Sequence, residues 1–219
     1  MTESPHAKEL RHPNARILIF AKAPRPGQVK TRLIPALGAE GAAAVHRLLV
    51  TQTVATVANA GLAPATLYCT PTSSDPFLTT LATDARMTLA VQQGHDLGER
   101  MAAALEAALH QARYAILVGT DCPGLSEPYL AQALEALGGG RDAVIGPAVD
   151  GGYVLIGLSR PPVPALFADI PWGTDQVLAA TQARLEALDW SWEALSPLRD
   201  LDRPADLEAL WGPLRAAAP

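Results

Sequence analysis

Short apolar segments alternate with longer segments of helical periodicity along most of this 219-residue chain. A short apolar run that precedes an amphipathic helix is typical of a strand–helix unit. A succession of such units builds a mostly parallel sheet with helices on both faces, so we expect an α/β fold. The expected strands lie at residues 16–21, 65–69, 87–91, 114–118, 142–145, 153–158 and 193–195.

The helical segments have recognisable ends. Gly61 follows the first long helix as a C-cap, and four prolines between residues 161 and 171 interrupt the chain before the fifth helix. The length suits one domain or two tightly joined halves, and we expect a flexible tail at 1–15 and a single domain at 16–219. The expected helices lie at residues 39–59, 77–81, 97–110, 127–137, 174–188 and 205–210.

The composition argues against several classes of protein. A hydrophobic content of 49% excludes a disordered chain, and 22 acidic against 17 basic residues argue against a broad basic face for nucleic acid. The two cysteines lack metal-ligand spacing, which favours a reduced compartment, and we find no apolar stretch of signal-peptide or membrane-span length. We therefore expect a cytoplasmic protein with neither a nucleic-acid nor a membrane partner.

The few lysines of the chain are concentrated at one place. Two of the three, Lys22 and Lys30, lie with Arg25 and Arg32 in the loop that follows the first expected strand. Ligands of open α/β sheets bind at the carboxyl ends of the strands, and a loop shaped by proline and Gly27 can direct backbone N–H groups and fixed charge at phosphate oxygens. The loop therefore favours phosphate binding over the alternative, a solvated basic loop without a ligand.

Two aspartates are candidate ligands of Mg²⁺. Asp121 follows a strongly apolar strand, where a carboxylate is costly to desolvate without a positive partner, and Mg²⁺ is typically held by one or two carboxylates together with substrate phosphates. Asp202 would supply the second carboxylate. The alternative for each is a capping role in the following turn or helix, and Asp206 is expected to be a favourable charge at a helix N-terminus.

Further polar residues follow the other expected strands. Gln93 and Arg100 lie after the third strand, and an acid with two glycines, residues 150–152, connects two strands either as a plain turn or as a ligand contact. In the segment 172–175, a threonine is either a helix cap or part of an acceptor pocket. We expect His46 to be structural.

Several segments together carry a resemblance to a known family. They are residues 20–24 and 27–33, the run GHDLGERM at 94–101, and residues 119–123, 150–158, 172–175 and 200–207. In these segments the chain resembles the DUF2064 family of glycosyltransferase-A-type proteins, whose members include nucleotide-diphospho-sugar transferases and glycosyltransferases linked to arsenosugar biosynthesis. More distantly, it is similar to phospholactate guanylyltransferases and to molybdenum-cofactor and sugar nucleotidyltransferases.

The resemblance implies a Rossmann-like nucleotide-diphospho-sugar transferase fold, with a nucleotide-binding part at about 16–140 and an acceptor-side part at about 141–219. It implies that Mg²⁺ or Mn²⁺ is held by Asp121 and Asp202. The chain departs from the related nucleotidyltransferases where Arg203 replaces a threonine and where Asp-Cys-Pro stands in place of a full DxD motif. The first-loop residues Lys22, Arg25, Gly27, Lys30 and Arg32 are the phosphate ligands that the resemblance implies. Together with Gln93, Arg100 and Asp121, which follow strands, they make up the expected nucleotide and phosphate ligands.

Two reactions and one non-catalytic role are compatible with these residues. In glycosyl transfer, our leading expectation, Lys30 and the metal stabilise a departing nucleoside diphosphate while Asp150 or Asp175 positions or deprotonates an acceptor hydroxyl. In nucleotidyl transfer, which four loop cations fit better, a triphosphate reacts with a phosphorylated acceptor and releases pyrophosphate. A non-catalytic nucleotide-binding module is the third possibility. The nucleobase, sugar, acceptor and oligomeric state stay open. The expected acceptor contacts are Asp150, Gly151, Gly152, Tyr153, Trp172 and Thr174.

Overall fold

A computed structural model describes residues 10–207 of the chain. A seven-stranded sheet with the order β3-β2-β1-β4-β6-β5-β7 forms its centre. All pairings are parallel except those of β6, which runs antiparallel to both β4 and β5, so the expected mostly parallel α/β sheet is confirmed. The strands are β1 (Ala15–Lys22), β2 (Ala65–Thr70), β3 (Thr88–Val91), β4 (Tyr114–Val118), β5 (Ala143–Pro147), β6 (Tyr153–Leu158) and β7 (Trp192–Ala194).

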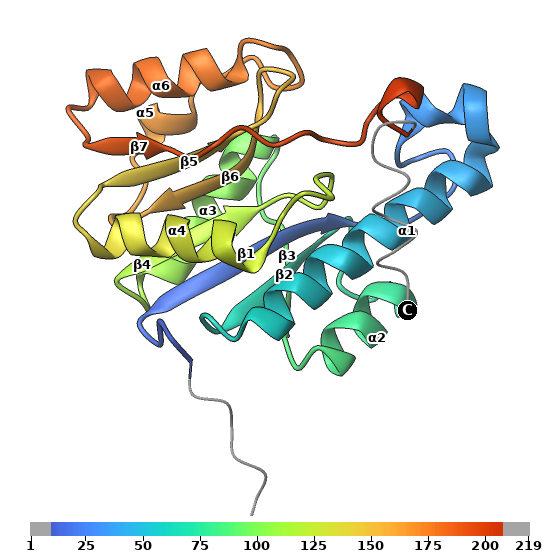
Figure 1. Cartoon of the computed structure of the whole chain (residues 1–219), viewed down its shortest axis with the longest axis horizontal. Coiled ribbons are helices and arrows are strands. Elements are labelled where there is room, and N and C mark those ends of the chain that lie inside the picture. Colours follow the sequence, from blue (N-terminus) through green and yellow to red (C-terminus); the bar gives the residue numbers. More distant parts are fainter. Residues whose placement is uncertain (1–9, 208–219) are drawn as a thin grey trace, which may run out of the picture.

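Helices cover both faces of this sheet, as Figure 1 shows. Buried residues of α1, α2 and α4 form one core cluster with the sheet, and those of α3, α5 and α6 form a second cluster on the opposite face. The helices are the 3-10 helix η1 (Thr31–Leu33), α1 (Ile34–Ala60), α2 (Pro76–Asp84), α3 (Leu97–Leu109), α4 (Glu127–Gly138), α5 (Pro164–Phe167) and α6 (Val177–Ala187).

The central strands are buried on both faces because both their odd-numbered and their even-numbered positions carry apolar side chains. In β1, Ile17 and Ile19 enter the cluster on the α1 side, whereas Leu18 and Phe20 enter the cluster on the α3 side. Successive side chains of a strand point to opposite faces, so an uninterrupted apolar run is what a strand covered by two helix layers requires.

The helix boundaries differ from the expected ones where glycine or proline changes the backbone. The first helix begins before residue 39, at Ile34, but Gly38 interrupts it with φ 69° and ψ 170°, while Gly61 closes it in the left-handed conformation as expected. The proline-rich region contains the unexpected short helix α5, and α6 begins three residues later than expected. The expected helix 205–210 begins one residue earlier, at 204; residues 204–207 are helical, and residues 208–210 lie outside the described part of the chain.

The segment Thr31–Ala60 is long and apolar enough to cross a membrane by length and composition, contrary to the expectation that no stretch would be. In the folded chain, its residues Val50, Val54 and Val57 are buried in the core cluster with the sheet. Packing against the sheet therefore accounts for the apolar residues on this face of α1.

Residues before the sheet are also held in place. The backbone N–H groups of Arg11 and His12 donate to the carbonyl oxygens of Gly61 and Leu62, at 3.3 and 2.7 Å. The Arg11 guanidinium also lies 3.1 Å from the Glu127 carboxylate of α4. The described part of the expected tail thus contacts the elements that flank β1.

The packing of α4 and β4 against Gly157 of β6 is a testable constraint. A Cβ atom on Gly157 of β6 would lie 2.8 Å from Ile116 Cγ2 and 2.9 Å from Leu137 Cδ1. We expect Gly157→Ala to lower the free energy of unfolding by about 1–3 kcal/mol in urea denaturation, because the core must shift to accept the methyl group. Gly124→Ala is the matched control, since its Cβ would meet no atom closer than 3.6 Å; equal stability of the two variants would contradict this packing.

Candidate active site

A cavity of about 730 Å³ opens at the carboxyl ends of the parallel strands. The chain passes from β1 to β2 and β3 on one side, then returns to β4 on the other, so the cavity lies where open α/β sheets bind their ligands. Its walls come from the ends of β1, β2 and β4, the start of α3, and residues 150–156, 172–177 and 200–203.

The structure brings together most of the residues that the sequence suggested for a site. Eleven of them line the cavity: Lys22, Arg32, Arg100, Asp121, Asp150, Gly152, Tyr153, Trp172, Thr174, Asp175 and Asp202. Five do not line it: Arg25, Gly27, Lys30, Gln93 and Gly151. Residues from the two halves of the chain therefore share one cavity, but the basic loop contributes fewer of its cations than expected.

Lys30 lies behind the cavity wall as a buried ion-pair partner. Its side chain is 3% exposed, and its ammonium group lies 2.6 Å from Asp121 Oδ1 and 3.4 Å from Asp202 Oδ1. It also donates a hydrogen bond of 2.6 Å to the carbonyl oxygen of Leu201. Lys30 thus joins the two aspartates expected to bind a metal. Within residues 10–207, neither carboxylate accepts a backbone hydrogen bond as a turn or helix cap, which was the alternative.

Two other loop cations, Lys22 and Arg32, are also engaged within the protein. Arg32 lies 2.6 Å from Asp202 Oδ2, and Lys22 donates to the carbonyl oxygen of Gln28 at 2.8 Å. The buried His46 of α1 holds the end of β1, since its Nε2 donates to the Lys22 carbonyl oxygen at 2.9 Å, as a structural histidine would. Of the four loop cations, Lys22 and Arg32 are the two that line the cavity.

Asp200 is a site residue that the sequence reasoning missed. Its Oδ1 is buried and has no hydrogen-bond partner in the described part of the chain. Desolvation, reinforced by the nearby carboxylates of Asp121 and Asp150, raises the pKa of Asp200 to about 7. Asp200 and Asp202 flank Leu201, which is fully buried, and both line the cavity. The alternation Asp200-Leu201-Asp202 could have revealed this residue. In an extended segment, an apolar residue between two acids places both acids on the same side.

Three expected local roles are settled by hydrogen bonds. Gln92 lines the cavity in place of Gln93, and its Nε2 donates to the Tyr68 carbonyl oxygen at 3.0 Å. Thr174 lies three residues before α6: its hydroxyl donates to the Pro171 carbonyl oxygen at 2.7 Å and accepts from the Gln176 N–H at 3.2 Å, so it stabilises the turn that leads into the helix. Asp206 has the expected place at a helix N-terminus, where it accepts a backbone hydrogen bond of 2.7 Å from Arg203.

Charges of both signs line the cavity, with carboxylates in excess. Its lining includes five aspartates and four cationic side chains. Among residues 10–207, no group of three or more His, Cys, Asp and Glu side chains is arranged to hold a metal ion by itself. The oxygen donors of Asp121 and Asp202 nevertheless fit a hard cation such as Mg²⁺, which takes its remaining ligands from water and substrate phosphates.

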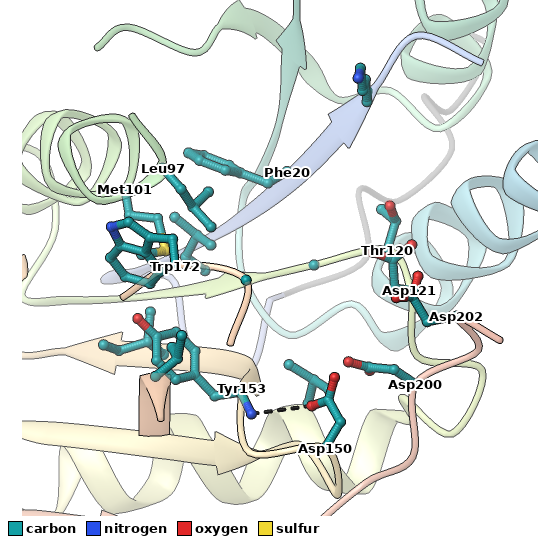
Figure 2. A pocket seen from close by; sticks show the side chains of 18 of the residues that line it. Phe20, Leu97, Met101, Thr120, Asp121, Asp150, Tyr153, Trp172, Asp200 and Asp202 are labelled. Carbon is teal, nitrogen blue, oxygen red and sulfur yellow. Dashed lines mark hydrogen bonds between the residues drawn. The ribbon is translucent and has the colours of Figure 1, made fainter. Parts of the chain in front are cut away.

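Close backbone contact fixes the turn between β5 and β6. Gly151 has φ 92°, and a Cβ atom there would lie 2.7 Å from the Cα atom of Asp175. Asp150 Oδ1 accepts a hydrogen bond of 3.1 Å from the Gly152 N–H (Figure 2). Gly151 therefore acts by letting the 172–175 segment approach the turn, which brings the two candidate acceptor acids into one wall.

The opposite side of the cavity is apolar. Figure 2 shows Phe20, Leu97, Met101 and Trp172 on one side, away from the labelled aspartates. A Cβ atom on Gly98 would lie 3.0 Å from Trp172 Cζ2, so the absence of a side chain at this position lets α3 pack directly against the indole. The residues at the start of α3 thus shape the site mainly through packing.

Comparison with known proteins identifies relatives of this chain. The model of the DUF2064 family, described as uncharacterized proteins conserved in bacteria, matches residues 53–174. The crystal structure of a proposed nucleotide-diphospho-sugar transferase from Desulfovibrio desulfuricans G20 matches with a TM-score of 0.84 and 31% identity, over 94% of this chain and 90% of that one. A comparison with curated proteins finds no match.

Two more distant structures share the fold alone. A 4-diphosphocytidyl-2C-methyl-D-erythritol synthase from Anaerococcus prevotii has a TM-score of 0.62 at 12% identity, over 93% of this chain and 96% of its own. A nucleotidyl transferase from Methanothermobacter has a TM-score of 0.57 at 15% identity, over 93% and 99%. The α/β fold expected from the sequence is therefore that of nucleotide-dependent transferases.

The buried carboxyl group predicts a pH-dependent stability. Because the pKa of Asp200 is raised from 3.8 to about 7, the folded protein holds the proton more tightly than the unfolded chain, and stability falls as pH rises through this range. We expect Asp200→Asn to be more stable than wild type at pH 8, by at most roughly 4 kcal/mol, and nearly equal at pH 4.

Denaturant unfolding in EDTA at the two pH values measures this difference. Asp175→Asn removes an exposed carboxylate of the same cavity and controls for the loss of one negative charge. A stability difference for Asp200→Asn that is the same at both pH values would show that the carboxyl group is not desolvated in the folded chain.

Proposed function

Because the chain belongs to the DUF2064 family, we propose that it is a glycosyltransferase that moves a sugar from a nucleotide-diphospho-sugar to a small acceptor. The observation that carries this proposal is the convergence of Lys22, Arg32 and Asp121 with Asp150 and Asp175 in one cavity at the switch point of the sheet. Residues that could bind a diphosphate and acids that could activate an acceptor thus line the same cavity. The 31% identity to the D. desulfuricans protein supports the proposal.

The engagement of the loop cations favours a diphosphate leaving group over a triphosphate substrate. Four free cations would suit a triphosphate, but Arg25 and Lys30 are absent from the cavity lining, and Lys30 is consumed by two carboxylates. Of the loop cations, Lys22 and Arg32 remain to contact phosphate oxygens, with Arg32 shared with Asp202; Arg100 and Arg203 line the cavity from other segments. A loop that presents two cations in place of four suits the charge of a departing nucleoside diphosphate better than the larger charge of a triphosphate.

Asp121 and Asp202 would hold the divalent cation, Mg²⁺ or Mn²⁺. The Asp121 side chain is 51% exposed and that of Asp202 34%, and both line the cavity, although Asp202 also pairs with Arg32. When bound, the cation would supply positive charge to a diphosphate that otherwise meets an excess of carboxylates. Lys30 holds the two aspartates together, which makes it a positioning residue.

Asp150 is the better candidate for the acceptor base. Its carboxylate is oriented by the Gly152 N–H, and its position in the turn before β6 directs it into the cavity, whereas Asp175 is the second candidate in the same wall. In the proposed reaction, an acceptor oxygen forms a bond to the anomeric carbon and the bond from that carbon to the diphosphate oxygen breaks. The acceptor proton passes to the Asp150 carboxylate, and the nucleoside diphosphate leaves.

A nucleotide panel tests this function. We expect nucleoside diphosphates and nucleotide-diphospho-sugars with one base to raise the melting temperature in the presence of Mg²⁺ and to lose most of this effect in EDTA. No triphosphate should release pyrophosphate when a phosphorylated acceptor is added. Pyrophosphate release would instead identify a nucleotidyltransferase, and binding that is unaffected by Mg²⁺, without turnover of any nucleotide-sugar, would identify a non-catalytic module.

The phosphate contacts are tested by two variants of one loop. We expect Lys22→Ala to weaken nucleoside diphosphate binding about tenfold in calorimetry, because a charge-assisted contact is lost. Arg25→Ala is the matched control, since it removes a cation from the same loop outside the cavity lining, and its affinity should match that of the wild type. Equal weakening by both variants would show a general electrostatic effect in place of a specific contact.

A further inference from the structure

The apolar side of the cavity takes no part in the proposed phosphate and metal contacts. Leu97 at the start of α3 is 42% exposed, although it is a large hydrophobic side chain, and it lines the cavity together with Phe20, Met101 and Trp172. An exposed leucine beside aromatic side chains in a cavity of this size is typical of a wall that an apolar part of a ligand covers.

The aromatic part of this wall is held rigidly before any ligand arrives. The ring of Trp172 packs edge-on against Tyr153, with centroids 6.4 Å apart and planes at 81°, and it contacts Phe167 at 6.4 Å on another side. Gly98 removes the side chain that would otherwise displace the indole. A preorganised aromatic surface binds with a smaller loss of conformational entropy than a mobile one.

The same segments that carry this apolar wall carry the candidate acceptor acids. Asp150 lies three residues before Tyr153, and Trp172 lies three residues before Asp175, with the two segments in backbone contact at Gly151. An acceptor whose hydroxyl group reaches either acid therefore has its body over Tyr153 and Trp172. The cationic end of the cavity, at Lys22 and Arg32, is left for the diphosphate.

From this arrangement we infer that the acceptor is an alcohol or phenol with a flat apolar body, bound between Leu97 and Trp172. This inference rests on the proposed glycosyl transfer and names its acceptor class. A polyhydroxylated sugar fits less well, because Phe20, Leu97 and Met101 offer no hydrogen-bond partners and the hydroxyl group of Tyr153 is itself buried. Hydroxyl groups of a sugar against these side chains would lose their bonds to water without replacement.

Binding of 2-naphthol tests the inference, with myo-inositol as the polar counterpart. We expect 2-naphthol, followed by its own fluorescence, to bind the wild-type protein, and to remain bound when the nucleoside diphosphate that raises the melting temperature is added to saturation with Mg²⁺. myo-Inositol should neither bind nor compete. With a nucleotide-sugar present, 2-naphthol but not myo-inositol should accelerate release of the nucleoside diphosphate.

Variants locate the binding to the apolar wall. Leu97→Ser replaces an exposed side chain, so the fold should survive, and it should weaken 2-naphthol binding about tenfold while nucleotide affinity stays unchanged. Trp172→Ala should weaken it at least as much. Val163→Ser is the matched control, because Val163 is an exposed apolar residue that does not line the cavity, and its affinity should equal that of the wild type.

The outcomes separate this inference from the function on which it rests. Displacement of 2-naphthol by the nucleoside diphosphate would overturn the inference, since the apolar wall would then hold the nucleobase. Equal affinity in Leu97→Ser and the wild type, or tighter binding of myo-inositol, would also overturn it while leaving glycosyl transfer intact. Pyrophosphate release in the nucleotide panel would overturn the proposed reaction itself.

Discussion

A buried ammonium group joins the three chain segments on which the site depends. Lys30 belongs to the loop after β1, Asp121 to the end of β4, and Leu201 and Asp202 to the segment after β7, and all three of these partners lie within 3.4 Å of Lys30 Nζ. A charge that is 3% exposed is tolerated only when it is paired and hydrogen-bonded. Because the ion pairs join segments from different parts of the sheet, the position of each aspartate depends on the other two segments as well as on its own.

This polar contact is supported by packing beneath it. Leu33 and Leu201 are both fully buried in one small cluster with Val45 and Leu49 of α1, so the residues next to Lys30 and Asp202 are held by apolar contacts. Lys30 itself has the left-handed conformation, φ 46° and ψ 42°, which is uncommon for a residue other than glycine. A backbone of this kind persists where the surroundings determine it, and such residues cluster at functional sites.

The sheet and the region of the site could be predicted from the sequence, but the contacts within the site could not. β4 and β6 lie at the expected residues because their apolar runs end sharply at Gly119 and at the turn before Tyr153. The basic loop was recognised from its composition, yet composition does not say which cations face the ligand. Lys30 turned inward because two carboxylates from distant segments meet it, and those partners are set by tertiary structure. Asp200 was missed for the same reason.

The reversal of β6 explains how the second half of the chain reaches the same site as the phosphate loop. Residues that follow parallel strands gather at one edge, which identifies Lys22 and Asp121 directly. β6 runs the other way, so it brings the residues at its start, Asp150 to Tyr153, to that same edge. An antiparallel strand at this position adds a second set of side chains to the site. The segment packed against these side chains determines which other residues reach the cavity beside them. At Gly151 that segment contributes Asp175, and beyond it Trp172, so acid and aromatic surface reach the cavity as one unit.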